Sequence, residues 1–229
     1  LTNKIAQKIE KDAKDEAQKI NLSKLKGPIL YLRAKSGFKP AIETAKQIFS
    51  EIEKNGIDSN IYGAVLKTVI KYGNDDEFEK VKRLFESETE PTKKNTSLSA
   101  LGSSKDKNII QKALKMVLSR KVRAQDRFIL FLALARNPHA AKQTWQFFKK
   151  SYEVLRKEIT SDTLFSHFVN VVRYLDAKEE IEDARNFFDG QNQKGYEKKL
   201  SQAFEEAELT LATRKRELPA IEKWLNEKY

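Results

Sequence analysis

Residues 139–157 read H-A-A-K-Q-T-W-Q-F-F-K-K-S-Y-E-V-L-R-K, and their spacing of apolar side chains decides the fold class. The apolar positions advance by four, three, four and three residues: Ala141, Trp145, Phe148, Tyr152, Leu155. This spacing places the side chains on one face of an α-helix, whereas a half-buried strand would alternate at every second residue. The stretch therefore predicts an amphipathic helix whose aromatic face packs into a core.

The same period continues along the chain in both directions, and no stretch alternates like a strand. The sequence therefore predicts an all-α protein. The expected helices are 2–20, 28–36, 40–55, 60–73, 75–88, 91–102, 106–119, 124–136, 139–157, 162–175, 178–189, 194–213 and 218–228. The expected core includes the large aromatic residues Trp145, Phe148, Phe128, Phe131, Phe168, Phe188, Phe204 and Trp224.

Glycine and proline divide this pattern into short helices. Glycine is favoured just after a helix, where a left-handed residue ends it, and proline is favoured in the first helical turn. Asp176 followed by Glu179 is typical of a capping box. Helix ends are expected at Gly37, Gly56, Gly73, Gly102 and Gly190, and helix starts at Pro28, Pro40, Pro91, Pro138 and Pro219.

Short connections between helices favour antiparallel neighbours. So many helices without long linkers predict an α-solenoid of antiparallel pairs, a superhelix of the HEAT or armadillo kind, and we expect residues 1–229 to form one such domain. Residues 128–135, F-I-L-F-L-A-L-A, are apolar all round, which predicts a helix of the inner layer that is buried on every side.

Charge is abundant but mixed, with 34% charged residues, 39% hydrophobic residues and a net charge of +11. The excess is mostly lysine interleaved with glutamate at helical spacing, so we expect solvated helix faces and no nucleic-acid partner. No apolar run is long enough to span a bilayer, so no membrane segment is expected in this fragment. The sequons at Asn21 and Asn95 leave glycosylation open.

The chain contains few residues that could bind a catalytic metal ion. A catalytic zinc site needs about three protein ligands, and the chain has no cysteine and two histidines, His139 and His167, on different expected helices. No H-E-x-x-H, Walker A, G-x-S-x-G or G-x-G-x-x-G motif occurs. We therefore expect no metal, no cofactor and no catalytic residue in this fragment.

Several motifs resemble the C-terminal helical domain of the zinc aminopeptidase family that includes aminopeptidase N, puromycin-sensitive aminopeptidase and the endoplasmic-reticulum aminopeptidases. The resemblance extends over most of the chain and is strongest from about residue 94 onward. Its specificity lies in the order and spacing of short matches, since no one match is distinctive alone. The short matches are L-S-A-L-G-S-S-K-D at 98–106, V-R-A-Q-D at 122–126, R-N-P at 136–138, W-Q-F-F-K-K at 145–150, F-F at 187–188 and I-E-K-W-L at 221–225.

The resemblance implies a non-catalytic domain of a parent aminopeptidase. In such enzymes a catalytic domain, which would lie upstream of residue 1, holds the zinc, and the helical domain bounds the chamber that admits the peptide. The chain begins L-T-N-K and is shorter than the family's domain, so we expect its first helices to be missing. The expected partners are peptide substrates and the chain's own catalytic domain.

The apolar helix at 124–136 gives the candidate site, because the family's inner layer faces the chamber. The candidate peptide-facing residues are Arg123, Gln125, Asp126, Arg127, Leu132 and Arg136. Leu132 stands where some members carry an arginine that selects the substrate's side chain, which argues against recognition of acidic amino-terminal residues. The structural alternative is that Asp126 caps the helix, Gln125 bonds a neighbouring turn and the arginines cover the preceding hairpin.

Two other functions remain open. One is a HEAT-like scaffold that binds an acidic protein through its lysine-rich surface, and the other is the same domain in a catalytically dead homologue. The departures Ser151-Tyr152 and 210–213, T-L-A-T, from the family's usual residues mark a diverged member. The fragment alone is expected to be inactive, and the sequence leaves the compartment open between the cytoplasm and an extracellular or membrane-anchored location.

Overall fold

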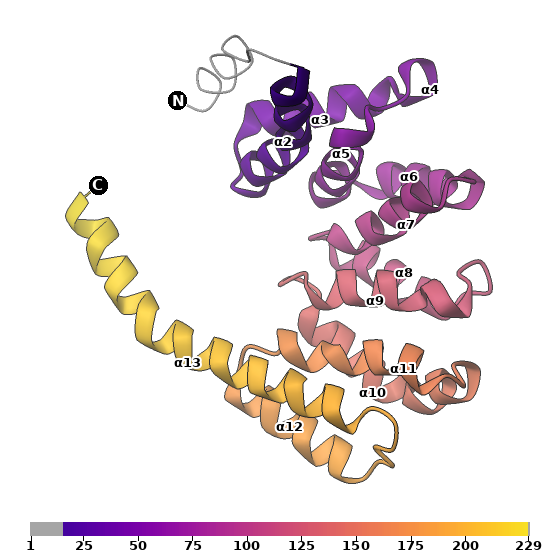
Figure 1. Ribbon diagram of the computed structural model, residues 1–229, viewed down its shortest axis with the longest axis vertical. Helices are drawn as coiled ribbons and strands as arrows, with labels where there is room; N and C mark the ends of the chain where they lie inside the picture. The colour runs from indigo at the N-terminus through magenta and orange to yellow at the C-terminus, as the bar shows by residue number, and fades with distance from the viewer. Residues whose placement is uncertain (1–15, 229) are drawn as a thin grey trace. The chain divides into compact units, whose positions relative to one another are not determined.

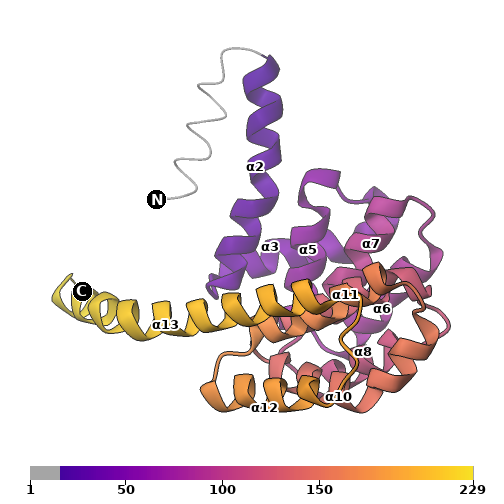
Figure 2. The ribbon, with the colours of Figure 1, turned by 60° about the horizontal axis from the view of Figure 1, so that its bottom comes forward.

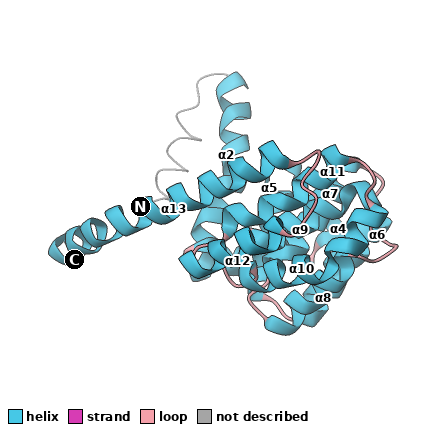
Figure 3. Cartoon of the chain, turned by 90° about the horizontal axis from the view of Figure 1, so that it is seen from below, coloured by secondary structure: helices cyan, strands magenta, loops and turns pink. Residues whose placement is uncertain are grey.

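The computed structural model describes residues 16–228, and within that range every regular element is a helix (Figures 1 and 3). The all-α prediction is confirmed. The α-helices are α2 (Glu16–Lys35), α3 (Lys39–Ser50), α4 (Ile52–Asn55), α5 (Ser59–Tyr72), α6 (Asp75–Ser87), α7 (Pro91–Ala100), α8 (Lys107–Val117), α9 (Arg127–Ala135), α10 (Ala141–Glu158), α11 (Asp162–Val169), α12 (Lys178–Asp189) and α13 (Glu197–Lys228). Three short 3₁₀ helices join them: η1 (Leu101–Ser103), η2 (Ala124–Asp126) and η3 (Asn170–Tyr174).

The chain forms two compact units, Leu1–Ile109 and Ile110–Tyr229, and the boundary falls within α8. In the first unit α5 is the central helix, in contact with α2, α3, α6 and α7. Its buried face carries Val65, Leu66 and Val69, each with no exposed surface. The three-and-four spacing predicted from the sequence is therefore what packs this unit. None of the helices between residues 16 and 228 is long and apolar enough to cross a membrane.

A glycine allows α2 and α5 to approach closely. A Cβ atom on Gly27 would lie 2.1 Å from the carbonyl oxygen of Asn60, a distance that no side chain tolerates. Two tyrosines of α5 form hydrogen bonds with neighbouring helices. The Tyr72 hydroxyl donates to the carbonyl of Ala34 in α2 at 2.7 Å, and the Tyr62 hydroxyl shares a 2.8 Å hydrogen bond with Ser97 in α7.

The second unit is packed around an aromatic cluster. Trp145 and Phe148 of α10 lie 5.8 Å apart between ring centroids, and both contact Phe188 of α12. Trp145 is 1% exposed, and its indole Nε1 donates to Asp183 at 2.5 Å. Such aromatic pairs add to the stabilisation that burial of their area already provides. Residues 139–157 therefore lie at the centre of this unit, as the spacing of their apolar side chains predicts.

Most of the predicted core is confirmed, with two exceptions. Trp145, Phe148, Phe131, Phe168, Phe188 and Phe204 are buried. Trp224 is 53% exposed, so its placement in the core is wrong. Phe128 is only half-buried, as are Ile129 and Ala133, so the prediction that the helix 128–135 is buried on every side is also wrong.

Three prolines do not start helices as predicted. Pro138 lies in the turn before α10, which begins at Ala141. Pro28 lies inside α2 and Pro219 lies inside α13, which runs as one long helix in place of the two expected at 194–213 and 218–228 (Figure 2). Proline cannot donate to the carbonyl four residues earlier, here those of Lys24 and Lys215. Both of these lysines are exposed, so water can hydrate the freed carbonyls. The expected helix 2–20 lies mostly outside the described residues.

The helix-end signals were partly right. Gly37 and Gly56 end their helices with φ values of 84° and 64°, as predicted. Gly73 and Gly190 also follow the last residues of α5 and α12, as predicted, but their conformations are not left-handed. The prediction is wrong for Gly102, which lies inside η1. The expected capping box is also wrong: α12 starts after Ala177 without a side-chain cap, and Asp176 accepts instead from Arg214 at 3.0 Å. A capping box does form at the start of α6, between Asn74 and Glu77.

Candidate peptide-binding site

The first part of the candidate site is the turn that leads into α9. Arg123 Nε donates to Asp126 Oδ2 at 2.6 Å, across the 3₁₀ turn η2. The Asp126 side chain is 12% exposed, while that of Arg123 is 64% exposed. Asp126 therefore holds Arg123 and makes no side-chain cap to α9, in contrast to the structural alternative considered from the sequence. Gln125 between them is exposed.

Arg127, the next residue, is directed into the protein. Its side chain is 7% exposed, its Nη1 donates to Glu158 at the end of α10, and its Nε donates to the carbonyl of Val122. Glu158 is 45% exposed, so the pair lies at the edge of the unit with the arginine inside. A peptide carboxylate would have to displace Glu158 to reach this guanidinium. Whether Arg127 contacts a peptide stays a prediction.

The remaining two candidate residues lie further along α9. Leu132 is 8% exposed, so its side chain is buried. Arg136 follows the last residue of α9 and is exposed. The nine residues of α9 span about 14 Å at the rise of an α-helix. Four of the six candidate residues therefore lie at or before the start of α9, Leu132 lies within the helix, and Arg136 lies just past its end.

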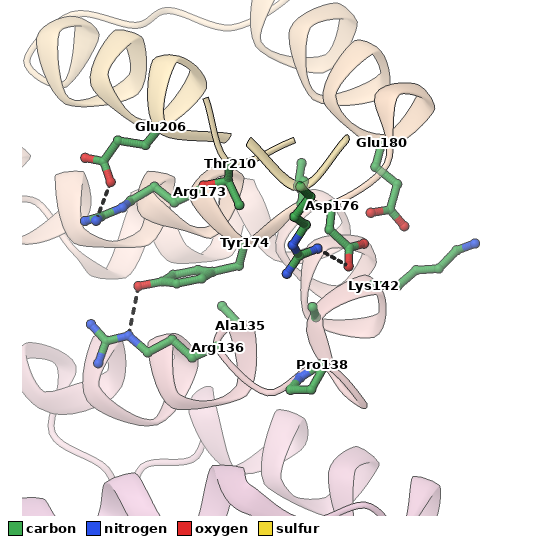
Figure 4. A pocket seen from close by; sticks show the side chains of 13 residues that line it. Ala135, Arg136, Pro138, Lys142, Arg173, Tyr174, Asp176, Glu180, Glu206 and Thr210 are labelled. Atoms are coloured by element: carbon green, nitrogen blue, oxygen red, sulfur yellow. Dashed lines mark hydrogen bonds and ion pairs between the residues drawn. The ribbon is translucent and has the colours of Figure 1, made fainter. Parts of the chain in front are cut away.

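Arg136 borders a pocket of about 540 Å³ (Figure 4). The pocket lies between the end of α9, the start of α10, η3, the start of α12 and the middle of α13. Arg136 Nε donates to the hydroxyl of Tyr174 in η3 at 2.8 Å, and its guanidinium carbon lies 5.8 Å from the centre of the same ring. This hydrogen bond holds the guanidinium beside the hydroxyl of Tyr174.

The charges around this pocket are mostly paired. Arg173 forms an ion pair with Glu206, and Arg214 pairs with Asp176 at 3.0 Å, so η3 and the turn that follows it are each tied to α13 (Figure 4). The lining holds four basic side chains, with Arg136 and Lys142 in addition to this pair of arginines. It holds three acidic ones, with Glu180 in addition to the two partners. The balance leaves one positive charge in excess.

The two histidines are not brought together by the fold. His139 is exposed ahead of α10, whereas His167 of α11 stacks on Phe128 with ring centroids 4.5 Å apart. Burial, together with the charge of Lys199, lowers the pKa of His167 from its usual value. Among residues 16–228 no three or more His, Cys, Asp or Glu side chains are grouped so that they could hold a metal ion. This part of the chain therefore offers no zinc site.

Sequence reasoning found Arg136 but missed the residues that surround it. Tyr174 lies 38 residues further on and Arg214 lies 38 residues beyond Asp176, so no local pattern links them. The only sequence signal was the R-N-P motif at 136–138, which marks the turn but not its partners.

Comparison with known proteins places the chain among aminopeptidase domains. The profile of the ERAP1-like C-terminal domain family matches residues 1–209. The thyrotropin-releasing hormone-degrading ectoenzyme of Rattus norvegicus is 26% identical over 190 residues, which is 80% of this chain and 17% of that protein. Aminopeptidase M1-B of Oryza sativa subsp. japonica is 25% identical over 65% of this chain and 17% of its own length. The alanine/arginine aminopeptidase of Saccharomyces cerevisiae is 21% identical over 80% of this chain and 22% of its own length. The chain thus spans about a fifth of these relatives.

Proposed function

Because this chain belongs to the ERAP1-like C-terminal domain family, we propose that it is the non-catalytic C-terminal domain of an aminopeptidase that removes amino-terminal residues from peptides. The observation that carries the proposal is the family match over residues 1–209, together with two relatives that are named as aminopeptidases and match 65% and 80% of the chain. The catalytic domain would lie upstream of residue 1, along with the first helices of the present domain.

In this proposal the chemistry belongs to the upstream domain. A zinc ion there would polarise a water molecule and the scissile carbonyl, as zinc does in metallopeptidases. The chain described here would bound the substrate chamber and control access to it. Gating elements of this kind exclude water and position the substrate without touching the reacting bond.

The exposed candidate residues support a contact with the peptide better than the buried ones. Arg123, Gln125 and Arg136 are open to solvent, whereas Arg127 and Asp126 are already engaged within the protein. Arginine presents a planar fork of donors that matches a carboxylate or a row of peptide carbonyls. We therefore place the peptide contacts at the exposed ends of α9, with Asp126 as the residue that positions Arg123.

The proposal is tested with the whole protein. The sequence upstream of residue 1 should contain H-E-x-x-H and a further glutamate about 20 residues later, a spacing that the family resemblance implies. The purified protein should hydrolyse an aminoacyl anilide, lose this activity on treatment with a zinc chelator and regain it with zinc. A protein with the domain but without the motif and without turnover would instead be a catalytically dead homologue. Tight binding of an acidic protein, again without turnover, would favour the scaffold function.

A further inference from the structure

The pocket at the end of α9 has the features of a site for a carboxylate. Arg173 and Arg214 are neutralised by Glu206 and Asp176. Lys142 and Glu180 also lie in the lining, where they form no ion pair with each other. Arg136 and Lys142 are therefore the lining cations to which the described residues supply no carboxylate partner, and of the two Arg136 is the one held by a hydrogen bond to another lining residue, Tyr174.

The environment of Arg136 prepares it for a ligand. An exposed arginine normally samples many rotamers, and holding it in one conformation costs entropy when it binds. Here the Tyr174 hydroxyl accepts from Nε at 2.8 Å, so the fold already restricts the side chain before a ligand binds (Figure 4). The two terminal amino groups remain available, and these are the groups that bind a carboxylate in a bidentate manner.

We infer that this pocket binds a carboxylate, with Arg136 as its anion-binding residue and Tyr174 as the positioning residue. A volume of about 540 Å³ exceeds what one carboxylate group fills and falls in the range of pockets that take small ligands or a few residues of a peptide. The carboxylate can come from an acidic side chain, from the end of a peptide or from a free small acid. A peptide source rests on the proposed function, whereas a free acid does not.

The test uses the 229-residue chain and follows the Nε–H signal of Arg136 in ¹⁵N NMR spectra, assigned by its absence in Arg136→Ala. Four probes are titrated: N-acetyl-dialanine with a free carboxylate, the same peptide amidated, N-acetyl-Ala-Glu-Ala-amide, and succinate. The expected result is a saturable shift with at least one carboxylate probe and none with the amidated dialanine. Saturation by the free-ended or the Glu-containing peptide identifies a chain end or a side chain, and saturation by succinate alone identifies a free acid.

Variants separate the site from a general charge effect. For the variants, binding is followed by the backbone amide signals of the residues that line the pocket, because substitution of Arg136 removes the Nε–H signal. Arg136→Ala should weaken binding of the effective probe by at least about tenfold, as expected for a lost charge-assisted hydrogen-bonded pair. Arg136→Lys keeps the charge and the fold but loses the fork, so it should also bind more weakly. Tyr174→Phe removes the hydrogen bond that positions Arg136 and should weaken binding less than Arg136→Ala does, since the guanidinium remains. The control is Arg120→Ala, which removes an exposed arginine of the same unit away from the pocket.

The inference is overturned if no carboxylate probe gives a saturable shift, or if Arg136→Ala binds the effective probe as tightly as the unaltered chain and the control Arg120→Ala do. Because the titration needs no catalysis, its failure leaves the aminopeptidase proposal standing. Conversely, a whole protein without turnover would not affect the titration.

Discussion

Arg127, the first residue of α9, forms an ion pair with Glu158, the last residue of α10, across 31 positions of sequence. The pair is asymmetric because the arginine side chain is 7% exposed and the glutamate side chain is 45% exposed. Removing the exposed partner leaves a buried charge without compensation, which is the more costly change. Removing the buried partner leaves a glutamate that water can solvate.

We therefore expect Glu158→Gln to lower the free energy of unfolding by about 1–3 kcal/mol, the cost of leaving a buried charged donor poorly satisfied. Arg127→Met keeps the packed stem of the side chain and should cost less. Urea unfolding of both variants measures the difference. Glu182→Gln, which disrupts the exposed pair of Lys178 and Glu182, is the control and should change stability by less than about 1 kcal/mol. A larger loss for Arg127→Met than for Glu158→Gln would show that packing, and not charge, dominates at this position.

The two tryptophans give a matched test of the core. Trp145→Ala should lower the free energy of unfolding by about 3–5 kcal/mol, as deletion of a large buried aromatic side chain usually does. Trp224→Ala should change it by about 0.5 kcal/mol or less, because Trp224 is 53% exposed on the outer part of α13. Denaturation monitored by circular dichroism measures both. Equal losses would mean that α13 packs along its whole length.

The pH dependence of stability should contain a contribution from His167. Its pKa is lowered in the folded protein, first by burial and then by the charge of Lys199, so the unfolded chain takes up a proton at higher pH than the folded one. Stability contributed by the neutral imidazole is therefore complete above the unfolded value of about 6.5 and declines as the pH falls through that value towards the lower folded pKa.

His167→Gln should accordingly lose less stability than the unaltered chain when the pH falls from about 7 to about 5. His139→Gln, which alters the other, exposed histidine, provides the comparison. Thermal unfolding across this pH range gives the measurement. If His167→Gln and the unaltered chain show the same slope, the packing of His167 on Phe128 does not disfavour its protonation.

The sequence predicted those features that depend on neighbours along one helix. The four-and-three spacing around Trp145 gave both the helix and its buried face, and this holds because helical geometry is local. The prediction from the sequence was wrong for Pro219, because the sequence does not distinguish a proline inside an exposed helix from one that starts a helix. The prediction was also wrong for Trp224, because the spacing of apolar residues around Trp224 does not show whether another helix covers its side chain.

The sequence likewise predicted only part of the candidate site. Arg136 could be found because it ends a long apolar helix next to an R-N-P turn. Its fixation by Tyr174 depends on how η3 packs against α9, which no spacing along the chain encodes. The burial of Arg127 likewise follows from the approach of α10, and not from the residues beside it.

The central claim is that this domain contacts the peptide substrate of an aminopeptidase, and steady-state kinetics of the whole protein carrying Arg136→Ala test it most directly. The substrates are a peptide of about eight residues with a free carboxylate and a single-residue anilide, which is too short to reach the pocket, and Arg120→Ala is the control. The account predicts a KM for the long peptide raised by about tenfold, with the anilide unaffected, because the lost contact contributes to binding and not to the chemical step. Equal effects on the two substrates, or no effect on either, would contradict it.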